Sequence, residues 1–105
     1  MTEAEDQQAE RALQQARHIF DGLLAGKIDR GLLTQSAAAF FTPQVLADAS
    51  ASLKALGPPE SLKQTSVTLR GGMTYRHFLI KFKDKSLRLS TLTAPGGKWE
   101  QYLIQ

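Results

Sequence analysis

Three side chains near the C-terminus could together support proton transfer. A turn centred on Pro95-Gly96 would make Glu100 and Tyr102 neighbours on one face of a predicted sheet. Arg76 would then lie diagonal to Glu100. A carboxylate base beside an acidic hydrogen-bond donor is an arrangement that isomerases use. Arg76, however, favours the ionised carboxylate, which suits an ion pair at a cavity rim better than a base working near neutral pH. We therefore predict no catalytic residue and no enzymatic activity.

The residue patterns of other common active sites are missing. The chain has no Cys, which excludes disulfides, thiolate nucleophiles and thiolate metal ligands. Ser52 and Ser61 each stand two positions before a lysine, whereas a β-lactamase-type nucleophile needs Ser-x-x-Lys. The only histidines, His18 and His77, have no carboxylate at ligand spacing. We expect neither a metal nor a cofactor.

The elements that must position these residues begin with helical patterns. Apolar residues recur at three- and four-residue steps over residues 3–25, which predicts an amphipathic helix capped by Thr2 and ended by Gly26. The other predicted helical elements are a short turn at residues 31–34 capped by Asp29, a brief segment Ala37–Phe41 capped by Thr34 or Ser36, and a helix from Thr42-Pro43 to Gly57.

Strand patterns occupy the remainder of the chain. Tight-turn signals separate short stretches of alternating character. The predicted strands are 64–70, 73–83, 86–93 and 98–104, joined at Gly71-Gly72, Asp84-Lys85 and Ala94-Pro95-Gly96-Gly97. Helices followed by strands joined in sequence predict a single α+β domain over residues 1–105, with N-terminal helices packed on a four-stranded antiparallel meander sheet.

The turns also predict the register and the two faces of the sheet. A turn at Asp84-Lys85 pairs Phe78 with Thr91, and the next turn pairs Leu89 with Tyr102. One face then carries Phe78, Ile80, Phe82, Leu87, Leu89, Tyr102 and Ile104, with a polar end of Arg76, Thr91, Thr93 and Glu100. The opposite face carries Tyr75, His77, Leu79, Leu92, Trp99, Gln101 and Leu103. Both faces are partly apolar, so both need cover.

Composition and charge limit the partners. Of 105 residues, 42% are hydrophobic and 22% charged, which is typical of an ordered soluble protein. No apolar run reaches the roughly 18 residues of a membrane span. The first residues lack a basic signal region, so we expect a cytoplasmic protein, or a periplasmic one if this is an excised domain. Residues 57–105 are basic, but only Phe82 interleaves the lysines, so we expect no nucleic-acid binding.

Four strings of residues carry a resemblance to a known superfamily. They are Gly26-Lys27-Ile28-Asp29-Arg30, Phe41-Thr42-Pro43-Gln44, Leu56-Gly57-Pro58-Pro59 and Leu69-Arg70-Gly71-Gly72-Met73-Thr74-Tyr75-Arg76. With the element order, they make residues 18–105 similar to NTF2-like (cystatin-like) domains that follow serine-hydrolase or β-lactamase-like modules in bacteria. The resemblance implies a non-catalytic accessory domain and supplies no catalytic residues.

Two functional hypotheses follow. The first is an accessory or dimerisation domain that buries the second sheet face, Tyr75 to Leu103 as listed above, against another copy or a neighbouring catalytic domain. Its anchors would be Trp99 and Tyr75, so Trp99→Ala should give a folded monomer. The second is a pocket for an amphiphilic acid. Its rim would be Arg76, Thr91, Thr93, Glu100 and Tyr102, and its apolar wall Phe40, Phe41, Phe78 and Ile80.

Overall fold

The chain folds into helices followed by a four-stranded sheet. The computed structural model describes residues 3–105, with side chains from residue 8 onward. The helical elements are α1 (Glu3–Leu24), the 3₁₀ helix η1 (Arg30–Leu32), α2 (Gln35–Phe40) and α3 (Pro43–Lys54). The strands are β1 (Ser61–Arg70), β2 (Met73–Lys81), β3 (Ser86–Thr93) and β4 (Trp99–Ile104). The predicted α+β class is confirmed, while the predicted cap at Thr2 lies outside the described residues.

Side-chain caps set the starts of the short helices. Thr34 Oγ1 accepts from the backbone N–H of Ala37 at the start of α2, and Thr42 does the same for Val45 at the start of α3. The Asp29 carboxylate accepts from the N–H of Gly31 in η1, as predicted. Helix α1 ends before Gly26, whose φ of 74° belongs to the left-handed region that favours glycine.

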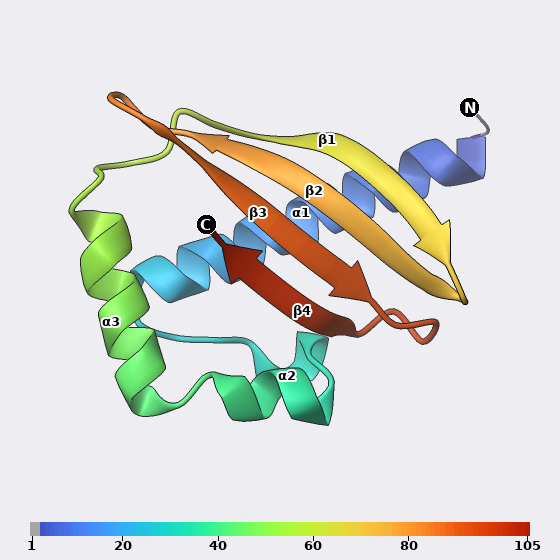
Figure 1. The fold of residues 1–105 in the computed structure, drawn as a ribbon, viewed down its shortest axis with the longest axis horizontal. Helices are drawn as coiled ribbons and strands as arrows, with labels where there is room; N and C mark the ends of the chain where they lie inside the picture. The colour runs from blue at the N-terminus through green and yellow to red at the C-terminus, as the bar shows by residue number, and fades with distance from the viewer. Residues whose placement is uncertain (1–2) are drawn as a thin grey trace.

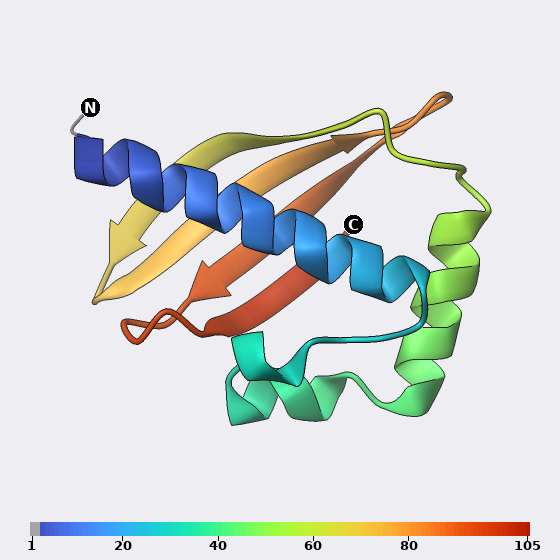
Figure 2. The same cartoon turned by 180° about the vertical axis from the view of Figure 1, so that it is seen from behind.

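The helices cover one face of the sheet. Figure 1 views the sheet with α1 behind it, and Figure 2 shows α1 crossing that hidden face from the β1 edge toward β4. Helix α3 packs against α1, and α2 packs against β4. We call the face under α1 the inner face and the opposite one the outer face. No described helix lies on the outer face (Figure 1).

The β2–β3 register differs from the prediction by two residues. The strands follow the order β1-β2-β3-β4 and are all antiparallel. Phe78 lies opposite Leu89 instead of Thr91. The hairpin closes where the N–H of Phe82 donates to the carbonyl of Lys85, so the turn is Lys83-Asp84 and not Asp84-Lys85. Because the shift is even, every side chain of this pair keeps its predicted face.

The β3–β4 pairing is also shifted, and it contains a bulge. Thr91 pairs with Tyr102, whereas Thr93 pairs with Trp99, so Glu100 is an extra residue on β4. The extra residue reverses the alternation of the strand beyond it. Trp99 therefore lies on the inner face with 0% of its surface exposed. The prediction that Trp99 lies on the outer face was wrong.

The core occupies the part of the inner face nearest the C-terminal half of α1. Ring contacts link the two layers, with the centroids of Phe20 and Phe82 6.2 Å apart. The largest fully buried side chains are Trp99, Phe20, Phe78, Phe82, Ile19, Ile80, Leu89 and Thr91. Leu33 and Phe41 extend this cluster to the segments around α2.

Candidate ligand cavity

A buried arginine marks the other part of the inner face. Arg76 projects from β2 with only 8% of its surface exposed. Its Nη1 donates to Oε1 of Gln64 on the adjacent strand at 2.9 Å. Its own carbonyl accepts from the hydroxyl of Thr91 at 3.0 Å, which anchors the strand beneath it. The described partner of the guanidinium is therefore a neutral amide, that of Gln64.

The charge of Arg76 has no acidic counterpart among the described side chains. Both ion pairs found there, Arg17 with Asp21 and His18 with Asp29, are elsewhere. Burial lowers the pKa of Arg76, although an arginine remains protonated in proteins. Burying a charge without a counterion costs free energy that a single hydrogen bond to a neutral amide does not offset. Such a group is retained at a cost in stability.

A cavity of about 520 Å³ opens beside this guanidinium. It lies between the N-terminal half of α1 and the two turns that follow β1 and β3. Its lining residues are Gln8, Arg11, Ala12, Gln15, Gly72, Thr74, Arg76, Thr93, Ala94, Pro95, Gly96, Gly97 and Trp99. We call this the Arg76 cavity. Its described lining contains two arginines and no carboxylate, so it favours anions.

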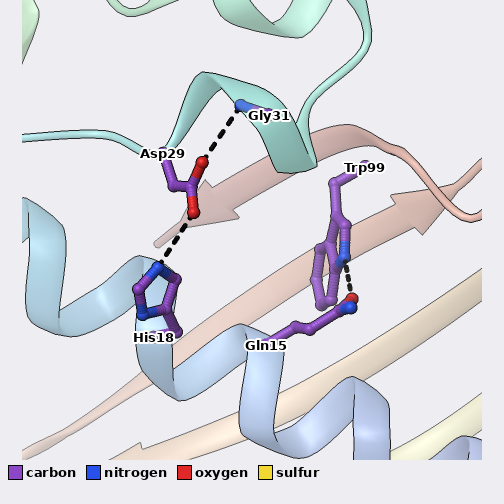
Figure 3. A network of polar contacts seen from close by, with 5 residues as sticks. All are labelled: Gln15, His18, Asp29, Gly31 and Trp99. Carbon is purple, nitrogen blue, oxygen red and sulfur yellow. Dashed lines mark hydrogen bonds and ion pairs between the residues drawn. The ribbon is translucent and has the colours of Figure 1, made fainter.

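A hydrogen bond between Trp99 and Gln15 lies where the Arg76 cavity meets the core. The Nε1–H of Trp99 donates to Oε1 of Gln15 at 2.7 Å, as Figure 3 shows. This contact satisfies the only polar atom of a fully buried indole. It also uses the acceptor of the Gln15 amide and leaves its two N–H donors available. A second contact in Figure 3, from His18 to Asp29, ties α1 to the cap of η1 on the exposed surface.

The structure divides the predicted pocket between two places. Arg76 and Thr93 line the Arg76 cavity, and Thr91 is buried beneath it. Glu100 and Tyr102 line a different hollow together with Phe40 and Phe41. No ion pair joins Arg76 to Glu100 in the described structure, because Gln64 is the partner that it contacts. Phe78 and Ile80 are packed in the core and line neither space.

Sequence reasoning missed the residues that α1 contributes. Gln8, Arg11 and Gln15 recur at three- and four-residue steps, so they share one side of the helix. This side continues toward Ile19 and Leu23 in the core. The sequence signal that could have identified these cavity residues is the change from apolar to polar residues along one side of α1.

The outer face holds the rest of the predicted interface. Tyr75 and Leu92 lie directly opposite each other and are half-buried. Leu79 and Leu103 are 39% and 38% exposed. His77 is exposed and its Nδ1 is 3.0 Å from the hydroxyl of Ser66. Gln101 is exposed at the β4 edge. This face without Trp99 has a smaller apolar area than predicted.

Comparisons with known proteins give no family for this chain. No protein-family model, curated protein or solved structure matches it. Among the described residues, no group of three or more acidic or histidine side chains could hold a metal ion. No helix in the described part of the chain has the length and hydropathy to cross a bilayer.

Proposed function

We propose that this protein is a non-catalytic binding domain that holds a small anionic ligand in the Arg76 cavity. The observation that supports this is an arginine with only 8% of its residue surface exposed, whose guanidinium contacts a neutral amide, has no acidic partner among the described side chains and lines a cavity without described carboxylates. A bound anion would provide a counterion for Arg76. Its attraction to the guanidinium would be stronger in this low-dielectric setting than in water. The stability that Arg76 costs the free protein would thus be recovered on binding.

The residues that line the Arg76 cavity indicate which class of ligand it would bind. A planar guanidinium pairs with the two oxygens of a carboxylate or phosphate. Around it stand amides of Gln8 and Gln15 and hydroxyls of Thr74 and Thr93, which suit a polar body. The apolar wall expected for an amphiphilic acid is absent here, because Phe78 and Ile80 lie in the core. We therefore favour a small polar acid.

The general arrangement is compatible with the superfamily suggested by the sequence. Helices lie on one face of an antiparallel sheet, as the resemblance to NTF2-like domains implies, and the cavity opens between the two layers. Membership of that superfamily and a role beside a catalytic domain are part of the same proposal.

A ligand panel tests the cavity directly. The purified protein is heated with hydroxy acids, dicarboxylates, sugar acids and sugar phosphates, because a ligand that binds only the folded state must raise the Tm. Hits are then titrated by calorimetry against Arg76→Gln and against Arg70→Gln, which removes an exposed arginine of the same sheet. We expect binding to be lost only in Arg76→Gln. Equal binding by both variants, or no hit across the panel, would contradict the proposal.

A second candidate function is self-association through the outer face. It is favoured by the half-buried Tyr75–Leu92 pair and by exposed Leu79 and Leu103 on a face that no described helix covers. Light scattering on a size-exclusion column across a concentration series is the test. A dimer that Leu79→Lys dissociates would support it, and a monomer at every concentration would exclude it.

A further inference from the structure

The outer edge of β4 carries backbone groups that no described segment pairs. Arg88 and Gln105 exchange N–H···O=C bonds of 3.0 and 2.8 Å. In an antiparallel ladder this pattern alternates, so Leu103 also points its backbone groups toward β3. Tyr102 and Ile104 then point theirs away from the sheet. No backbone hydrogen bond to them from a loop or helix is found in the described structure.

The chain itself begins to pair with this edge and then leaves it. Leu33 forms a single parallel bridge with Trp99, and the N–H of Thr34 donates to the carbonyl of Trp99 at 3.0 Å. Thr34 then caps α2, so the following residues become helical and cannot continue the pairing. The β4 edge can therefore pair with another segment. Beyond Trp99, no described backbone pairs with it on this side.

An apolar hollow of about 430 Å³ runs along the open part of this edge. Glu100 to Leu103 form one side, and Ser36, Ala37, Phe40 and Phe41 form the other. Phe40 is 59% exposed and packs edge-on against the buried Phe41, with ring centroids 5.2 Å apart. An aromatic ring that packs against a buried neighbour yet is open to solvent is suited to contact with a partner.

We propose that this edge groove binds an extended peptide segment, which pairs with Tyr102 and Ile104 as an added strand. Strand addition takes its affinity from backbone hydrogen bonds and its specificity from alternate side chains. One side chain would be apolar and contact Phe40, and a neighbouring one would be basic and face Glu100, the only charged residue in the described lining of the groove. A second copy fits less well, because α2 packs beside β4 where another sheet would have to lie (Figure 1).

A defined peptide panel tests the proposal. The probes are blocked heptapeptides in which Thr alternates with Val, Leu, Phe or Tyr, each made with a terminal Lys or a terminal Glu. We expect Lys-terminated members to bind, measured by fluorescence polarisation, and Phe40→Ser to lose the binding. The control is Leu69→Ser, which removes an apolar side chain that is 78% exposed on β1. N-methylation of the pairing residues of the best peptide should abolish its binding.

Amide hydrogen exchange distinguishes strand addition from other contacts. In the saturated complex, exchange of the Tyr102 and Ile104 amides should slow by about tenfold or more, because pairing with the peptide gives each of them a hydrogen-bond acceptor. Binding that leaves these two amides unchanged would overturn the proposal, as would the absence of any binder in the panel. Protection without peptide together with a doubled mass would instead show a second copy at the edge. None of these results depends on the Arg76 cavity.

Discussion

The two ends of the inner sheet face use the same helix and the same strands for opposite purposes. Toward the C-terminal end of α1, Phe20 and Phe78 pack in a layer with almost no exposed surface. Toward its N-terminal end, Arg11 and Arg76 border a cavity of about 520 Å³. The first end excludes water and charge, while the second buries a charge and leaves space beside it. Stability therefore comes mainly from the first end, and the second is where we propose that a ligand binds.

The largest effect should come from the residue at the border of the two ends. Trp99→Ala removes a fully buried indole that also contacts Tyr102, with ring centroids 6.0 Å apart. The free energy of unfolding should fall by about 3–5 kcal/mol, as for large-to-small changes in a core. Urea unfolding measures the loss. The control Leu69→Ala should change stability by less than about 0.5 kcal/mol, because that side chain is exposed.

This outcome differs from the one that the sequence predicts. Trp99 on the outer face would be an interface residue, and its loss would give a folded monomer. A stable Trp99→Ala variant with a smaller mass in solution would therefore restore that interpretation and contradict the packing described here.

The sequence predicted the helices, their caps and the order of the strands, because these depend on local residue types. Thr42 and Asp29 cap their elements as predicted, and of the two candidate caps for α2 the structure uses Thr34. The predicted faces were not changed by the two-residue error in the β2–β3 register, because an even shift preserves the alternation of side chains. The predicted face was wrong at Trp99, because the extra residue Glu100 changes the alternation and has no turn signal of its own.

The candidate site was predicted only in part. Arg76 was expected near the cavity, but as the partner of Glu100 at a rim. Burial without a counterion depends on which strand neighbours approach, and the neighbour is Gln64. The contribution of Gln15 from α1 depends on how the helix crosses the sheet, which no local pattern specifies. The residues that meet at the candidate site are therefore set by contacts distant in the sequence, which local residue patterns do not predict.

The next effect should have the opposite sign. Arg76→Met replaces a buried charge that has no acidic partner among the described side chains by an apolar side chain of similar length, so the free protein should gain about 1–2 kcal/mol of stability. The oxygen of Gln64 loses its donor, but this residue is only half-buried and can contact water. Chemical unfolding without ligand measures the change. A destabilised variant would mean that Arg76 is structural, and the contrast between the two ends would disappear.

A destabilising effect of similar size should follow at the hydrogen bond between Gln15 and Trp99, where the two ends meet. Gln15→Leu leaves the Nε1–H of Trp99 buried without its acceptor, which should cost about 1–2 kcal/mol. Gln14→Leu changes an exposed neighbour on the same helix and serves as the control. A double-mutant cycle with Trp99→Phe isolates the pair, since the Gln15 change should cost much less once the indole N–H is gone. Equal costs in both backgrounds would show that the bond contributes nothing.

The smallest change in the free energy of unfolding at neutral pH is expected for Tyr102→Phe. Its pH dependence tests whether the apolar end excludes a charged side chain. Burial, together with the Asp21 carboxylate, raises the pKa of Tyr102, whose hydroxyl donates to the carbonyl of Ala16 at 2.9 Å. Tyr102→Phe should cost about 1 kcal/mol at pH 7 through the lost hydrogen bond. Above pH 10 the unfolded chain releases this proton while the folded one keeps it, so the wild type should lose stability faster than the variant, by up to about 1.4 kcal/mol per pH unit. Parallel slopes for the wild type and Tyr102→Phe would show that this end admits a charge after all, and that the two ends differ less than their packing indicates.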